Sequence, residues 1–180
     1  VRIQMRRRAP GSSDLTTHRS ETDDPLVMSG ILNGVTTGAP ISAIFRNKDQ
    51  NSAAYHPEIP RPSHADYAAT VRFGGHADLR GGGAFSGRLT ACLVFAGAVC
   101  RQILERRGIT ITANAVRVGQ ATGKELNFDM KRAILDARSA GDSVGSELEC
   151  VVTGVPPASA GCSSAAWRAA LPACSMPSPA

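Results

Sequence analysis

The chain has 180 residues and a mass of 18.8 kDa, with 42% hydrophobic and 19% charged residues. This length suits one domain with a hydrophobic core and is marginal for two. The composition excludes a disordered chain, a coiled coil and a collagen. The apolar stretch 89–100 spans 12 residues, too few to cross a bilayer, so we also exclude a bundle of membrane helices.

The chain carries an excess of positive charge, and arginine supplies most of it. The net charge is +5, the isoelectric point is about 9.3, and 17 arginines stand against 3 lysines. The planar arginine fork grips phosphate or carboxylate at two points, so this bias favours small anionic ligands. A GC-rich genome produces the same bias without selection on chemistry. Nucleic-acid binding is a third interpretation, but aromatic residues, at 4% of the chain, offer few stacking surfaces.

The cysteines indicate free thiols. They form no Cys-x-x-Cys pair and have no histidine at zinc-ligand spacing, so we predict no metal site. Their odd number, without a signal peptide, favours a reducing compartment and hence a cytoplasmic protein. Cys92 and Cys100 fall in an apolar helical stretch and are predicted to be small core residues. The others are Cys150, Cys162 and Cys174.

The first half of the chain predicts a helix end, a hairpin and a long loop. The basic run 6–8 is followed at once by Ala-Pro-Gly, which ends a helix, and the abrupt start suggests that the first part of a domain is absent. The apolar stretch 26–32 runs into the turn-forming Asn-Gly pair 33–34, and 41–45 follows as a second strand. Residues 47–66 are polar and broken by proline, which predicts a loop, and long loops are often functional.

The second half predicts alternating helices and strands. A glycine-rich loop at 80–88 opens a helix that is apolar nearly all round and is therefore predicted to be buried. Residues 109–118 alternate as a strand, with a phase slip near Asn114 that indicates a bulge. An amphipathic helix is predicted over 128–140, and the alternation over 144–152 predicts a half-buried antiparallel strand.

These elements predict an α+β fold without internal repeats. One domain is expected over residues 1–157. From residue 158 to 180 the chain consists mostly of Ala, Ser, Pro, Gly and Cys, with a single Trp167. Such a segment buries too little surface to offset its ordering entropy, so we predict a low-complexity, disordered tail.

The glycine-rich loop is the first candidate site. Three consecutive glycines, 81–83, let backbone N–H groups approach an anion, and the following helix N-terminus adds partial positive charge. Arg80 and Arg88 flank the loop. The pattern is neither a P-loop nor a Rossmann turn. A turn that serves only tight packing is an equally good interpretation.

The second candidate is His64, in the segment Arg-Pro-Ser-His-Ala-Asp-Tyr at 61–67. Pro62 stiffens the approach to the histidine, and Asp66 is placed to steer the ring or its protonation. Histidine is the side chain most easily used as a general acid near neutral pH. The alternative is a surface-loop histidine without a role.

A basic N-terminal cluster is the third candidate. Free in solution it is a solvated charge run, whereas opposite the glycine-rich loop it would clamp a phosphorylated acid. Residue spacing alone therefore predicts a binder of small anions and leaves open whether it is an enzyme. The cluster consists of Arg6, Arg7, Arg8 and Arg19.

Seven stretches, taken together and in order, resemble the chorismate synthase family. The resemblance covers residues 2–157, which correspond to the interior of the N-terminal half of the family's chain. So many specific stretches in the right order exclude chance. They are RRAPG at 7–11, MSGILNGVTTGAPI at 28–41, RNKDQ at 46–50, RPSHADY at 61–67, RGGGAFSGRLTA at 80–91, GDSVG at 141–145 and GVPP at 154–157.

The resemblance implies a fold, a reaction and a cofactor. The family fold is a β-α-β sandwich, here partial, with antiparallel sheet packed on buried helices, and the family enzyme is usually a homotetramer. It is a carbon–oxygen lyase that converts 5-enolpyruvylshikimate 3-phosphate to chorismate and phosphate by anti-1,4-elimination. The reaction needs reduced FMN without net redox change, and NADPH serves as flavin reductant in bifunctional members. No nucleic-acid or membrane partner is implied.

Position by position, the resemblance also implies site residues. His64 matches a proposed catalytic proton donor near the flavin and the leaving phosphate. The cofactor contacts match Ala84, Phe85 and Ser86. Arg8 matches an arginine that binds substrate phosphate or NADPH. With Arg8, we expect Arg80 and Arg88 to bind the anionic substrate or NADPH.

The departures from the family pattern predict low activity for this chain alone. A GESHG segment with another functional histidine would precede Val1, and Asp14 stands where many members have a basic residue. After Pro157 the usual Gly-Leu-Gly is replaced, and later flavin-binding and catalytic motifs are missing, which suggests a frameshift or a truncated gene. The alternative to an enzyme is thus an inactive remnant with residual flavin or anion binding.

Overall fold

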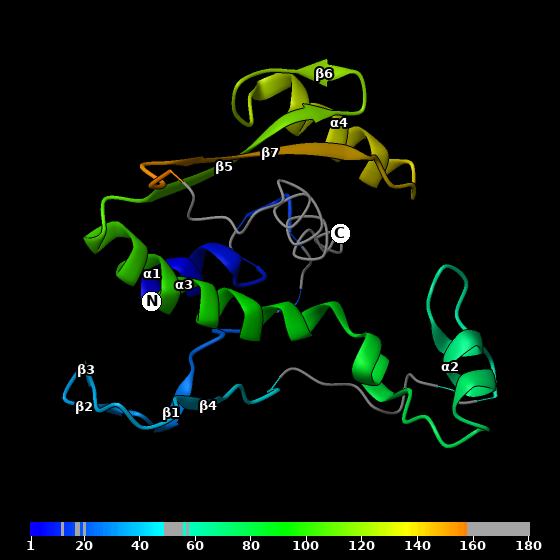
Figure 1. Cartoon of the computed structure of the whole chain (residues 1–180). Helices are drawn as coiled ribbons and strands as arrows, with labels where there is room; N and C mark the ends of the chain where they lie inside the picture. The colour runs from blue at the N-terminus through cyan, green and yellow to red at the C-terminus, as the bar shows by residue number, and fades with distance from the viewer. Residues whose placement is uncertain (12, 17–18, 20, 49–55, 57, 158–180) are drawn as a thin grey trace. The chain divides into compact units, whose positions relative to one another are not determined.

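The computed structural model describes residues 1–11, 13–16, 19, 21–48, 56 and 58–157 (Figure 1). It divides into two compact units, which are described separately. Among the described residues, the first unit contains 1–11 and 19–96, and the second contains 13–16 and 97–157. The predicted tail at 158–180 and most of the loop at 49–57 lie outside the described residues.

The first unit begins with the predicted helix and hairpin. Helix α1 (Arg2–Arg8) ends directly before the predicted stop, Ala9, Pro10 and Gly11. Strands β2 (Ile31–Leu32) and β3 (Val35–Thr36) form an antiparallel pair around Asn33 and Gly34, which both have positive φ. This is the turn geometry that an Asn-Gly pair favours. Strand β1 (Leu26–Ser29) pairs antiparallel with β4 (Ser42–Ile44).

The first unit continues through a short helix into the glycine-rich loop. Helix α2 (Asp66–Arg72) lies where the sequence predicted no helix. The loop contains η2 (Arg80–Phe85), in which the three glycines interrupt the 3₁₀ backbone, and the short 3₁₀ helix η3 (Gly87–Leu89), which runs into helix α3 (Thr90–Arg106). The predicted order of glycine-rich loop and apolar helix is therefore confirmed.

Helix α3 is apolar as predicted, but it is not buried all round. Its buried positions are Ala91, Phe95 and Ala98, which share one stripe at helical spacing. Leu93 and Ile103 are 55% and 49% exposed. A single contact stripe covers only one side of a helix, so the predicted complete burial is wrong.

The prediction that two cysteines of α3 belong to the core is also wrong. Cys92 and Cys100 are both exposed, because they lie off the stripe that α3 buries. By length and composition, the segment Gly87–Arg106 could cross a membrane, with a mean hydropathy of 1.3. The core helix of a soluble protein meets the same criteria, so length and composition alone do not distinguish such a helix from a membrane-spanning one.

The second unit is a three-stranded antiparallel sheet with one helix against it. The strand order is β6 (Ala121–Thr122), β5 (Thr110–Val118) and β7 (Ser146–Thr153), and Figure 1 shows the long β5 and β7 side by side. The pairing of β5 with β7 shifts register between Ala115 and Arg117. The predicted bulge is therefore present, a little beyond Asn114.

Helix α4 (Phe128–Ser139) contacts β5 and β6. Its first turn is capped by the Asn127 side chain, which accepts a hydrogen bond from the Met130 backbone, and the Met130 side chain is fully buried. Strand β7 was predicted to be half-buried, but only Val152 is partly covered. In the second unit, α4 makes its main contacts with β5 and β6, so alternation alone misjudged the burial of β7. The α+β class is confirmed.

Candidate functional site

The fold brings His64 directly against the glycine-rich turn. Gly81, Gly82 and Gly83 all have positive φ, at 63°, 87° and 52°. A Cβ placed on Gly82 would lie only 3.2 Å from His64 Nε2. Residues with a Cβ rarely adopt such a backbone, and here a Cβ would also press on the imidazole. The two candidate motifs, separate in sequence, therefore form one site.

Asp66 orients the His64 ring from the opposite side. As the first residue of α2, Asp66 is 3% exposed, and its Oδ1 lies 2.7 Å from His64 Nδ1. His64 follows Ser63, which has a φ of 59°, so the backbone turns sharply there. The ring thus presents Nδ1 to the carboxylate and Nε2 to Gly82. This direct contact supports the prediction that Asp66 orients the His64 ring.

Arg61 completes this network and keeps Asp66 ionised. The Asp66 carboxylate accepts hydrogen bonds from Arg61 Nε at 2.7 Å, from Arg61 NH2 at 2.8 Å and from the Arg61 backbone N–H at 3.1 Å. The Arg61 side-chain hydrogen bonds hold the pKa of Asp66 well below its usual range, although burial of the carboxyl opposes them. Asp66 is therefore a carboxylate over the whole physiological pH range.

The three predicted flavin contacts form the outer edge of the turn. Ala84 and Phe85 are exposed, with Phe85 at 42%, and Ser86 is half-buried. The Ser86 hydroxyl accepts a hydrogen bond from the Arg88 backbone at 3.3 Å and caps the short η3 segment. Residues 84–86 thus offer an accessible surface, and two positions before them a Cβ on Gly82 would lie 3.2 Å from His64 Nε2.

Arg80, a predicted anion ligand, is paired with a neighbouring carboxylate. Its Nε and NH2 donate to Asp78 at 2.9 and 2.6 Å. These hydrogen bonds lower the pKa of Asp78 to about 2 and raise that of Arg80. Both side chains are exposed, at 67% for Arg80 and 60% for Asp78, so the pair is well screened by water.

Arg8 and Arg88, the other predicted anion ligands, share one buried carboxylate. Asp23 Oδ2 accepts from Arg8 NH1 at 2.5 Å, and Oδ1 accepts from Arg88 NH1 at 2.6 Å. The Asp23 side chain is fully buried. Arg8 NH2 also donates to Thr90 Oγ1 at 3.1 Å and to the Gly87 carbonyl at 3.4 Å. Arg8 therefore does lie against the glycine-rich segment, as the clamp hypothesis required.

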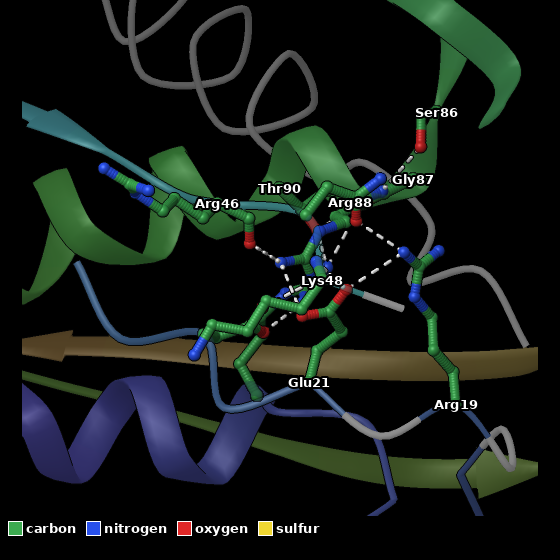
Figure 2. A network of polar contacts seen from close by, with 11 residues as sticks. Arg19, Glu21, Arg46, Lys48, Ser86, Gly87, Arg88 and Thr90 are labelled. Atoms are coloured by element: carbon green, nitrogen blue, oxygen red, sulfur yellow. Dashed lines mark hydrogen bonds and ion pairs between the residues drawn. The ribbon is translucent and has the colours of Figure 1, made fainter. Parts of the chain in front are cut away.

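Glu21 forms the second acidic member of this cluster (Figure 2). Its carboxylate accepts from Arg19 NH2 at 3.1 Å and from the Lys48 backbone at 2.9 Å, and it lies 3.6 Å from Arg88 NH2. Arg88 NH2 also donates to the Arg46 carbonyl at 3.1 Å. We call Arg8, Glu21, Asp23 and Arg88 the buried ion cluster.

Sequence reasoning missed the acidic half of the buried ion cluster. Glu21 and Asp23 are 6% and 3% exposed, and burial of two carboxylates requires cationic partners. The available signal was the acidic run at 21–24 between basic segments of an arginine-rich chain. Of the four arginines in the predicted basic cluster, Arg8 and Arg19 reach these carboxylates, whereas Arg6 and Arg7 are exposed.

A hollow of about 260 Å³ lies beside the buried ion cluster. Its wall includes the apolar side chains of Leu26 and Phe45 together with charged residues of the same unit. In the part of the chain that the structure describes, no group of three or more His, Cys, Asp or Glu side chains is arranged to hold a metal ion. The residues around the hollow are Thr22, Asp23, Asp24, Leu26, Phe45, Arg46 and Lys48.

The close fit of His64 against the turn makes a testable prediction. A Gly82→Ala variant is expected to lower the free energy of unfolding by roughly 1–3 kcal/mol, because the new Cβ is strained at its positive φ and presses on His64. The matched control is Gly81→Ala, also at positive φ but with no atom within 4 Å, which costs about 1 kcal/mol. Urea unfolding followed by circular dichroism measures both. Equal losses in the two variants would contradict the proposed contact.

Comparison with known proteins identifies the chain's relatives. The family described as chorismate synthase matches residues 1–174. A chorismate synthase of Korarchaeum cryptofilum is 42% identical over 174 residues, covering 83% of this chain and 48% of that protein. A chorismate synthase of Pyrococcus abyssi is 42% identical over 175 residues, covering 86% of this chain and 48% of its own length.

The fold agrees with these sequence relatives. A crystal structure of chorismate synthase matches with a TM-score of 0.56 at 24% identity, covering 73% of this chain and 44% of that one. At this identity the likeness shows the fold. The chain spans about half the length of the curated relatives it matches.

Proposed function

Because this chain belongs to the chorismate synthase family, we propose that it carries the flavin-facing part of a lyase that forms chorismate. The reaction is the anti-1,4-elimination of phosphate from 5-enolpyruvylshikimate 3-phosphate, with reduced FMN as cofactor and no net redox change. NADPH as flavin reductant, a homotetrameric enzyme and a cytoplasmic location belong to the same proposal. One observation carries it: His64 Nε2 lies against the glycine-rich turn that bears residues 84–86.

The residues at the turn are suited to an anionic, planar cofactor. Gly82 has no Cβ, so His64 can lie against the backbone of the turn, and the space beside Gly81, where a Cβ would meet no atom within 4 Å, is open. Ala84 and Phe85 are exposed, and they offer small and aromatic surface on the same turn. When bound there, reduced FMN supplies an electron-rich ring that assists breakage of the carbon–oxygen bond to phosphate.

His64 is the residue that holds and moves a proton in this proposal. An ionised Asp66 carboxylate can only accept, so its contact with Nδ1 favours the tautomer with a proton on that nitrogen, and Arg61 NH2 lies 3.1 Å from Nδ1 and 3.4 Å from Nε2. Nε2 then remains the atom that exchanges a proton on the side of Gly82. A proton delivered from Nε2 to the departing phosphate would stabilise the leaving group.

Of the three arginines predicted to bind anions, Arg80 is available to a ligand, whereas Arg8 and Arg88 hold the fold together. Arg80 has the most exposed guanidinium of the three predicted anion ligands, and its Asp78 partner is exposed as well. A phosphate group can therefore compete for Arg80 at little cost. Arg8 and Arg88 are 20% and 16% exposed and are committed to a fully buried carboxylate.

Anaerobic titration with reduced FMN tests the proposal. We expect saturable binding by the chain, and weaker binding by Gly82→Ala than by Gly81→Ala. Single-turnover assays with 5-enolpyruvylshikimate 3-phosphate are expected to give little or no chorismate, because about half of the relatives' length is not represented in this chain. The absence of flavin binding by the unmodified chain would refute the proposal.

The second candidate is an inactive remnant that retains flavin or anion binding. Arg8 and Arg88 are held by the buried Asp23 carboxylate rather than being free for a ligand, which favours this candidate. Both candidates predict flavin binding and little or no chorismate formation by this chain alone. Measurable turnover would exclude the remnant, and its loss in His64→Ala would assign the proton to this imidazole.

A further inference from the structure

We infer that Asp23 is a positioning residue, which holds the segment 86–90 and thereby the flavin-facing turn in place. This inference deepens the proposed function and rests on it where it concerns flavin. Asp23 touches neither the turn nor His64 in any described contact. It acts through Arg8 and Arg88, the two arginines that it joins.

The first step of the argument is that one carboxylate fixes two chain segments. Arg8 is the last residue of α1, and Arg88 lies in η3. The two oxygens of Asp23 each accept from one of these guanidiniums, at 2.5 and 2.6 Å. The Asp23 side chain is fully buried, so water cannot replace it as acceptor.

The second step is that both arginines contact the segment that follows the turn. Arg8 NH2 donates to Thr90 Oγ1 and to the Gly87 carbonyl, and Thr90 Oγ1 itself donates to that carbonyl at 2.6 Å. The backbone N–H of Arg88 donates to Ser86 Oγ. Residue 86 is a predicted flavin contact, so the chain of contacts runs from Asp23 to the turn.

The third step concerns the backbone of Asp23. Its φ is 52°, a left-handed conformation that Asp and Asn tolerate better than other residues with a Cβ. The substitution Asp23→Asn therefore keeps both the shape and the backbone preference. It removes one negative charge and one acceptor between Arg8 and Arg88, which makes it a clean test of positioning.

The experiment combines hydrogen exchange with flavin titration on the full chain. In Asp23→Asn, amides of residues 82–90 are expected to exchange at least tenfold faster, and the affinity for reduced FMN is expected to fall at least tenfold. The matched control is Glu105→Gln, which breaks a carboxylate–guanidinium pair of the same 2.6 Å length, with Arg101, at exposed positions on α3. This control is expected to change neither quantity by more than twofold.

A second variant keeps the test decisive if Asp23→Asn fails to fold. Thr90→Val removes the hydroxyl that Arg8 contacts and leaves every charge in place. We expect a two- to fivefold loss of flavin affinity from Thr90→Val alone. Where Asp23→Asn does fold, the double variant is expected to lose less flavin affinity than the product of the two single losses, because both substitutions act through the same segment. If the two substitutions damaged the structure independently, the loss of flavin affinity in the double variant would equal the product of the two single losses.

The outcomes separate the inference from the proposed function. Unchanged exchange at residues 82–90 in both Asp23→Asn and Thr90→Val overturns the positioning role, whatever the flavin result. Faster exchange with unchanged FMN affinity also overturns it as a statement about the flavin site. If the unmodified chain fails to bind FMN, the proposed function fails, while the exchange data still decide whether Asp23 fixes the turn.

Discussion

Gly83→Ala is expected to lower the free energy of unfolding by roughly 3 kcal/mol and to abolish saturable flavin binding. A Cβ at residue 83 would lie 2.2 Å from the backbone carbonyl oxygen of Asp78, which no side-chain rotation can relieve. The φ of 52° with ψ of −131° is also a conformation that is strained for any residue with a Cβ. The turn must therefore reorganise, and residues 84–86 move with it.

The matched control for Gly83→Ala is Gly75→Ala. Gly75 also has a positive φ, of 82°, but a Cβ there would meet no atom within 4 Å. We expect this control to lose about 1 kcal/mol and to keep flavin binding. Urea unfolding monitored by circular dichroism, and reduced-flavin titration, measure both variants. A Gly83→Ala chain as stable as Gly75→Ala would show that the close approach of the turn to Asp78 is not maintained in solution.

Asp66→Asn is expected to lower the free energy of unfolding at pH 7 by roughly 2–4 kcal/mol. The substitution leaves the Arg61 guanidinium and His64 Nδ1 without their shared, buried carboxylate. Because the folded-state pKa of Asp66 lies below its unfolded value, near 4, the carboxylate contributes its full stability above that value. This contribution is lost progressively as the pH falls below it.

The difference between the unmodified chain and Asp66→Asn should therefore shrink from pH 5 to pH 2. Unfolding midpoints measured across this range provide the test. The control is Asp78→Asn, which removes the exposed partner of Arg80, and we expect little change in its midpoint at any of these pH values. A constant difference between the unmodified chain and Asp66→Asn down to pH 2 would contradict the assigned role of Asp66.

Elements with a local signal were predictable from the sequence. The Asn33–Gly34 pair specified the β2–β3 turn, the Ala-Pro-Gly segment ended α1, and residue alternation located β5 and β7. Helix α2 was missed because its seven residues are too few to establish an apolar period. The pairing of His64 with Asp66 was also local, since the two residues are only two positions apart.

Features that depend on distant residues were not predictable. Asp23 lies 15 positions from Arg8 and 65 from Arg88, so no spacing rule could join the three. The burial of α3 depends on what packs against it, and its apolar sequence does not say which sides are covered. The closeness of His64 to Gly82 was expected only because both motifs occur in one family. The structure shows that a Cβ added to Gly82 would lie 3.2 Å from His64 Nε2.

The three adjacent glycines also restrict which amino-acid substitutions the protein can tolerate at these positions. Every single-base change that alters the amino acid encoded by a glycine codon introduces a Cβ or a stop signal. At residues 81–83 each such change meets a left-handed backbone, and at 82 and 83 it also meets a close neighbour. Each single substitution away from this tripeptide therefore costs stability, so its loss in a descendant lineage would indicate that selection on the turn had ceased.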